Sequence, residues 1–72
     1  MNIAEFITHL ESAIDSPVGS ISAGQALSDI LEWDSLAVVS FIALADAKYG
    51  KKVSPAALKD CKTVDDLAAL VA

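Results

Sequence analysis

Residues 32–36 read Glu-Trp-Asp-Ser-Leu and begin the longest helical pattern in the chain. Asp34 or Ser35 can supply the N-cap, and the run 36–49 contains neither glycine nor proline. A helix start of this kind concentrates free backbone N–H groups and the positive end of the helix dipole around the Ser35 hydroxyl. A phosphate ester on that hydroxyl would therefore be electrostatically favoured. Taken alone, an Asp-Ser pair is more often only a helix cap.

The chain has 72 residues and is 54% hydrophobic, which predicts one small domain with a compact core. The single cysteine, Cys61, excludes an internal disulfide, and with the one histidine, His9, it leaves no credible zinc site. We expect Cys61 to be a packing residue rather than a nucleophile. The longest strongly apolar run, residues 36–45, is far short of the roughly 20 residues that span a membrane, and the N-terminus has no basic targeting region. These features predict a soluble cytoplasmic protein without membrane insertion.

The formal net charge is −5, and the charges are unevenly distributed along the chain. Residues 1–47 contain seven acidic residues and no lysine or arginine, and all five lysines lie within residues 48–62. The field around Ser35 should therefore be negative. This argues against nucleic acid as a partner and favours basic protein partners.

The first predicted helix has Asn2 as its cap, and its apolar residues recur at helical spacing, namely Ile3, Phe6, Ile7, Leu10 and Ile14. We expect the other side to carry Glu5, Thr8, Glu11 and Asp15. Ser16 and Pro17 should end this helix, because the residue before a proline is pushed out of the helical region. Residues 16–34 then form a long connection. We expect it to pack along the helices, with a short helical turn near residues 28–31 and with Leu27 and Trp33 as anchors.

The second helix, predicted over about residues 35–49, is apolar on two sides. One stripe holds the bulkier residues, which are Val38, Phe41, Ile42, Ala45 and Tyr49. The other stripe holds smaller residues, which are Leu36, Val39, Ser40, Ala43 and Ala47. Because a domain this small cannot easily bury a whole helix, we assign the bulky stripe to the core and the smaller stripe to an outward docking surface.

The remainder of the chain carries two further helix starts. Gly50 suits the C-cap of the second helix, and Ser54 followed by proline begins a short third helix. Thr63 and Asp66 form a capping-box pattern at the start of the last helix, whose apolar face holds Leu67, Leu70 and Val71. No strand pattern or internal repeat occurs. The sequence predicts an all-α fold, a small bundle of three main helices and one short helix with a long first loop.

These features resemble the acyl and peptidyl carrier protein family, whose members bind phosphopantetheine. The resemblance extends from about residue 27 to residue 72. It rests on Leu27-x5-Trp33-Asp34-Ser35-Leu36, on Tyr49-Gly50 and on the Thr-Val-Asp-Asp-Leu of residues 63–67, whereas the first helix agrees in pattern only. Asp-Ser-Leu alone is a weak pattern, but these flanks in a chain of this length make it specific. The resemblance implies a bundle of the acyl-carrier-protein type, with residues 1–72 forming a single carrier domain.

The resemblance also implies a function for the residues at the start of the second helix. A phosphopantetheinyl transferase would attach the 4′-phosphopantetheine arm of coenzyme A to Ser35, and the thiol of the arm would carry an acyl or aminoacyl group as a thioester. Asp34 would help to present Ser35 to the transferase and its metal ion. A loading enzyme (an acyl or aminoacyl ligase or an acyltransferase) and a downstream synthase or transferase would then dock, on a surface that holds Leu36, Val39, Ser40 and Ala43. We expect the carrier to be a monomer.

The second helix is also where the sequence departs from the family. Many carrier proteins place glutamates at the positions of Ser40 and Ala47, and Ala37 matches another frequent acid. Docking should therefore depend more on apolar contact than on long-range electrostatic steering. The Trp-Asp-Ser-Leu form looks more like stand-alone carriers of specialised pathways, including aminoacyl carriers, than like the typical fatty-acid-synthesis form. Fatty acid, polyketide and nonribosomal peptide pathways all stay open.

Two other classes of function stay open as well. The alternative is an unmodified helical interaction module that uses the outward stripe of the second helix and in which Ser35 is a plain cap. An enzyme is the more distant reading, because the chain has one histidine, His9, and no arginine. Asp34 and Ser35 do not form an ordinary base–nucleophile pair, since adjacent helical residues point apart. Modification of Ser35 distinguishes the carrier from the interaction module.

Overall fold

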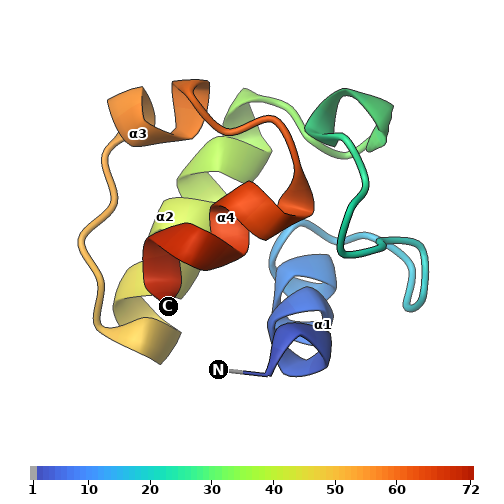
Figure 1. The fold of residues 1–72 in the computed structure, drawn as a ribbon, viewed down its shortest axis with the longest axis horizontal. Coiled ribbons are helices and arrows are strands. Elements are labelled where there is room, and N and C mark those ends of the chain that lie inside the picture. Colours follow the sequence, from blue (N-terminus) through green and yellow to red (C-terminus); the bar gives the residue numbers. More distant parts are fainter. Residues whose placement is uncertain (1) are drawn as a thin grey trace.

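The computed structural model describes residues 2–72, which form four α-helices and one 3-10 turn (Figure 1). The elements are α1 (Ile3–Ala13), η1 (Leu27–Asp29), α2 (Ser35–Tyr49), α3 (Pro55–Lys59) and α4 (Val64–Val71). Between residues 2 and 72 the structure contains no strand, only an isolated bridge, and no helix long and apolar enough to cross a membrane. The predicted all-α fold with one short helix and a long first loop is confirmed.

The helices pack around α2 and α1. α1 contacts α2 and α4, and α2 also contacts α3. In Figure 1, α4 crosses in front of α2, with α1 beside the pair and α3 at the upper left. α1 begins and α4 ends in the lower half of this view, whereas α2 begins at the top. In this view, the start of α2 thus lies on the opposite side of the molecule from the first residues of α1 and the last residues of α4.

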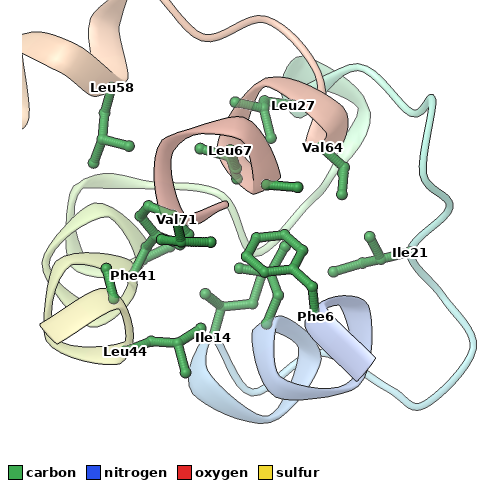
Figure 2. Close-up of a cluster of buried hydrophobic side chains, with 14 of the residues drawn as sticks. Phe6, Ile14, Ile21, Leu27, Phe41, Leu44, Leu58, Val64, Leu67 and Val71 are labelled. Carbon is green, nitrogen blue, oxygen red and sulfur yellow. The ribbon is translucent and has the colours of Figure 1, made fainter. Parts of the chain in front are cut away.

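A single hydrophobic core joins all four helices to the first loop (Figure 2). Phe6 of α1 and Phe41 of α2 are fully buried and meet edge to face, with their ring centroids 6.1 Å apart. Leu67 of α4 is also fully buried, and Leu58 is the buried residue of α3. The first loop closes the core with three buried side chains, Ile21, Leu27 and Ile30. Burial on this scale is the main source of stability for a domain of this size.

The first helix begins as predicted and ends earlier than predicted. The Asn2 side chain caps it by accepting the N–H of Ala4 at 2.8 Å. The helix ends at Ala13, before the expected Ser16-Pro17 stop. Asp15 adopts a left-handed conformation with φ of 61°, and the N–H of Ser16 donates to the carbonyl of Glu11 at 2.8 Å. This is a Schellman closure, so backbone hydrogen bonds rather than the proline end α1.

The prediction that Glu11 faces outward is wrong. Its side chain is only 3% exposed. The carboxylate accepts the N–H of Gly19 at 2.8 Å and the N–H of Ile21 at 3.2 Å. A buried acid is tolerated here because two main-chain donors replace the water that it loses. Glu11 thereby holds the first loop against α1.

The rest of the first loop is anchored as the sequence predicts. The expected helical turn is η1, which starts at Leu27, slightly before the predicted range. Trp33 is half-buried, and its ring centroid lies 6.4 Å from that of Phe41. An isolated bridge also joins the loop to the start of α4, through the bonds from Leu27 N–H to the Lys62 carbonyl at 2.9 Å and from Val64 N–H to the Gln25 carbonyl at 3.0 Å. The loop is therefore held by main-chain as well as side-chain contacts.

The core face of α2 is shifted around the helix relative to the predicted bulky stripe. Its buried residues are Ala37, Phe41, Leu44 and Ala45. The other members of the predicted stripe, Val38, Ile42 and Tyr49, are only half-buried and pack at the edge of the core. Side-chain bulk was a poor guide, because the small residue Ala37 is buried whereas the larger Val38 and Ile42 lie at the edge of the core.

The remaining helix ends agree with the predicted caps. Gly50 takes a left-handed φ of 64° and ends α2 by donating its N–H to the Asp46 carbonyl at 3.2 Å. Ser54 caps α3, whose first residue is Pro55. Thr63 and Asp66 form the predicted reciprocal capping box of α4.

Candidate functional site

Asp34, and not Ser35, is the cap of α2. The Oδ1 atom of Asp34 accepts the N–H of Ala37 at 2.9 Å, and its carbonyl accepts the N–H of Val38 at 3.0 Å. Ser35 is the first residue of the helix and is exposed, and its hydroxyl forms no hydrogen bond within residues 2–72. The sequence left open whether Asp34 or Ser35 caps α2, and the structure assigns the cap to Asp34. The Ser35 hydroxyl is therefore accessible for a reaction.

The backbone around Ser35 is suited to a phosphate group. The N–H groups of Ser35 and Leu36 precede the first helical hydrogen bond, which Val38 makes, so no helical carbonyl is available to them. The positive end of the α2 dipole adds to these donors. A phosphodiester on the Ser35 oxygen would lie beside both, with its arm free to extend into solvent. The residues present therefore fit a phosphate-linked prosthetic group.

The segment that leads into Ser35 is held in place by contacts of Trp33 and Glu32. The N–H of Trp33 donates to the Ile30 carbonyl at 3.1 Å, while its ring packs on Phe41. Glu32 accepts a hydrogen bond of 3.0 Å from the Ser16 hydroxyl. Ser35 is therefore presented by a constrained turn rather than by a free loop.

A hollow of about 260 Å³ lies beside Ser35, between the end of α1 and the start of α2. Its apolar lining includes Ile14, Leu36 and Ala37. Its carboxylates are Asp15, Glu32 and Asp34, and no basic side chain among residues 2–72 lines it. These acids do not converge on a metal site in the part of the chain that the structure describes. The surroundings of Ser35 are acidic, as the charge distribution predicts.

The predicted docking residues lie together on the outward side of α2. Leu36 is 73% exposed and Val39 is 62% exposed. Ala43 is also exposed, and Ser40 is half-buried at the edge of the same face. Ala37, which we expected at a surface position that often carries an acid, is only 3% exposed. It belongs to the buried core, so it is not part of the outward surface.

Neither His9 nor Cys61 lies among the residues around Ser35. The ring of His9 meets that of Tyr49 edge to face, with centroids 6.4 Å apart. Cys61 is half-buried, and its thiol donates to the Ala57 carbonyl at 3.6 Å. Burial, with smaller contributions from Asp66 and Asp60, raises the pKa of the Cys61 thiol. A raised pKa fits a packing role rather than a nucleophilic one.

Sequence reasoning missed two side chains that hold the first loop near Ser35. Glu11 bonds to the loop backbone, and Ser16 bonds to Glu32. The spacing of Glu11 did carry a usable pattern. It follows Ile7 by four residues and precedes Ile14 by three, which places it within the apolar stripe of α1. No sequence pattern indicates the contact between Ser16 and Glu32, because it depends on the path of the intervening loop.

Comparison with known proteins points to one family. The family model described as "phosphopantetheine attachment site" matches residues 3–71. The solution NMR structure of a holo acyl carrier protein from Geobacter metallireducens superposes with a TM-score of 0.76 and is 26% identical to this chain. That match covers 99% of this chain and 83% of the other. No curated protein sequence matches the chain.

Proposed function

This chain belongs to the family of phosphopantetheine attachment domains, and from that membership we propose that residues 1–72 act as one carrier domain with Ser35 as its attachment point. The cofactor is 4′-phosphopantetheine, bound covalently, as in the family and in the holo acyl carrier protein that the fold matches. When attached, it supplies a thiol at the end of a long flexible arm, on which an acyl or aminoacyl group is held as a thioester. The domain itself is a non-catalytic carrier in this proposal.

One observation supports Ser35 above all others. Its hydroxyl is exposed at the first position of α2 and has no hydrogen-bond partner within residues 2–72, because Asp34 performs the capping. A phosphopantetheinyl transferase can therefore reach the Ser35 oxygen without disturbing the helix start. Asp34 holds this start in place and lies next to the reacting oxygen, which is the basis of its proposed role in presenting Ser35 to the transferase.

The outward face of α2 is the proposed docking surface for successive enzymes. Leu36, Val39 and Ala43 offer exposed apolar contact directly after Ser35, and Ser40 borders them. The proposed partners are the transferase, a ligase or acyltransferase that loads the thiol, and a synthase or transferase that unloads it. A small apolar face of this kind favours weak and rapidly dissociating complexes, which a carrier needs in order to visit several enzymes.

The test is the intact mass of the protein after incubation with coenzyme A, magnesium and a broad-specificity phosphopantetheinyl transferase. The wild-type protein should gain one phosphopantetheinyl group, and Ser35→Ala should gain none. Ser12→Ala, which removes an exposed hydroxyl of α1 outside the proposed docking surface, is the matched control and should be modified like the wild type.

Two results would contradict the proposal. A folded wild-type protein that several transferases leave unmodified would favour an unmodified interaction module that uses the exposed Leu36 and Val39. Modification of Ser35→Ala to the wild-type extent would place the attachment point on another residue.

A further inference from the structure

A series of close contacts, made through hydrogen bonds, the backbone and two neighbouring hydroxyl groups, links the buried Glu11 to the residues just before Ser35. The Glu11 carboxylate accepts the N–H groups of Gly19 and Ile21, at 2.8 and 3.2 Å. These two residues flank Ser20, so the acid fixes the backbone on both sides of that serine. Because Glu11 is almost completely buried, this end of the link is shielded from water.

The link continues from Ser20 to Glu32. The hydroxyl of Ser20 donates to the Pro17 carbonyl at 2.6 Å and lies 2.8 Å from the hydroxyl of Ser16. Ser16 is buried, and its hydroxyl donates to Oε1 of Glu32 at 3.0 Å. Glu32 is separated from Ser35 by only Trp33 and Asp34. Contacts that begin on α1 therefore end next to the segment that presents the reactive hydroxyl.

We infer that the hydrogen bond between Ser16 and Glu32 makes Glu32 a positioning residue for modification of Ser35. This inference rests on the proposed attachment of phosphopantetheine at Ser35. By holding Glu32, the Ser16 hydroxyl limits the movement of the turn that ends in Asp34 and Ser35. A nucleophile held in one place reaches the reacting geometry more often than one carried on a mobile turn, so the contact acts on the rate of transfer.

A different role for Glu32 would be a surface charge that attracts a basic transferase. The two roles make opposite predictions. A charge acts at a distance, depends on the carboxylate alone and affects mainly the encounter between the proteins. A positioning contact depends equally on Ser16, which is neutral and buried. In such a contact, an uncharged oxygen acceptor at residue 32 can take the place of the Glu32 carboxylate.

The experiment measures kcat and KM for transfer of phosphopantetheine to the wild-type protein and to four variants. Glu32→Ala and Ser16→Ala should each lower kcat by about threefold to tenfold, the range expected for a half-exposed hydrogen bond to a charged group, with KM unchanged. The double variant should be no slower than the slower single variant, because both changes remove the same contact. Glu32→Gln keeps an oxygen acceptor for Ser16 and should retain the wild-type kcat. Ser28→Ala removes an exposed hydroxyl of η1 that makes no hydrogen bond with any described residue, and it should match the wild type.

A second measurement needs no enzyme. Trp33 is the only tryptophan and follows Glu32 directly, so its fluorescence reports on the presenting turn. Ser16→Ala and Glu32→Ala should change its emission and anisotropy at temperatures where circular dichroism shows every variant folded. Glu32→Gln and Ser28→Ala should not.

The outcomes separate this inference from the proposed function. If the wild-type protein is modified at Ser35 while Ser16→Ala keeps the wild-type kcat and the wild-type fluorescence, the positioning role is wrong and the carrier function stands. If Glu32→Gln and Glu32→Ala both raise KM to the same extent while kcat stays at the wild-type value, Glu32 acts as a docking charge and the inference is again wrong. If no transferase modifies the wild-type protein, the proposed function fails, and with it the role of Glu32 in that reaction, whatever the fluorescence shows.

Discussion

The carboxylate of Glu11 and the backbone N–H of Gly19 form a hydrogen bond of 2.8 Å inside the protein. The same carboxylate oxygen accepts the N–H of Ile21. Residues 1–47 contain no lysine or arginine, so no such side chain lies close in the sequence to pair with this acid. Backbone dipoles satisfy it instead, so the Glu11 side chain holds the part of the first loop around Gly19 and Ile21 against α1.

Replacement of Glu11 should be among the most damaging changes on α1. Glu11→Ala leaves the N–H groups of Gly19 and Ile21 without their acceptor and should lower the free energy of unfolding by about 2–4 kcal/mol. Glu11→Gln keeps one carbonyl acceptor and should lose less. Urea denaturation measures both changes, and Glu5→Ala on the exposed side of the same helix is the control. A loss for Glu11→Ala no larger than that of the control would show that the loop is held by its apolar contacts alone.

The division of roles between Asp34 and Ser35 predicts an asymmetry in stability. Asp34→Ala removes the side-chain bond to Ala37 and should cost about 1 kcal/mol, as for other N-caps. Ser35→Ala removes a hydroxyl that has no hydrogen-bond partner within residues 2–72, and it should stay within about 0.5 kcal/mol of the wild type. Thermal denaturation of the two variants under the same conditions checks this. If Ser35→Ala were the more damaging change, Ser35 would be the cap in solution.

The outward face of α2 should tolerate charge, whereas its core face should not tolerate truncation. Leu36→Lys should slow transfer and loading by partner enzymes, because it puts a charge into an apolar contact, while the unfolding free energy changes by less than about 0.5 kcal/mol. Phe41→Ala empties a fully buried position and should cost about 3–5 kcal/mol. Ala69→Lys on the exposed side of α4 controls for the added charge. A large loss of stability in Leu36→Lys would mean that Leu36 belongs to the core.

The capping box of α4 gives the protein a defined response to acid. The backbone N–H groups of Lys62 and Thr63 donate to the Asp66 carboxylate at 2.8 and 3.1 Å, and these bonds lower the pKa of Asp66. Because the pKa is lower in the folded than in the unfolded state, the stabilisation is complete above the ordinary aspartate pKa. It is lost as the pH falls through the lowered value.

Melting temperatures measured from neutral pH into the acid range test this response. Asp66→Asn should flatten part of the decline in stability at low pH, and Asp65→Asn, a neighbouring exposed change, should leave the decline intact. Equal acid profiles for the wild type and Asp66→Asn would show that Asp66 does not contribute.

Local patterns predicted most of this fold because its helix boundaries are set locally. Asn2, Gly50, Ser54 and Thr63 each satisfy backbone groups within a few residues, and all four were identifiable as caps from their neighbours alone. The attachment motif was equally local, and its family is confirmed over residues 3–71.

The features that could not be predicted depend on contacts between distant parts of the chain. The spacing of Glu11 places it within the apolar stripe of α1, but its hydrogen bonds to Gly19 and Ile21 require a loop that folds back onto that helix. The burial of Ala37 in place of Val38 and Ile42 depends on how the other elements pack around α2. The bond between Ser16 and Glu32 joins residues that are sixteen positions apart. Neither hydrophobic spacing nor residue size carries information on such approaches, because both describe one element at a time.

The placement of the start of α2 opposite the first residues of α1 and the last residues of α4 has a practical consequence (Figure 1). A fluorescent protein, an affinity tag or a solid support can be linked to either end of residues 2–72 without crowding the serine at the head of α2. The domain can thus be immobilised or displayed while enzymes approach from the free side. Modification of Ser35, as proposed above, would make the domain a modular handle for enzymatic labelling.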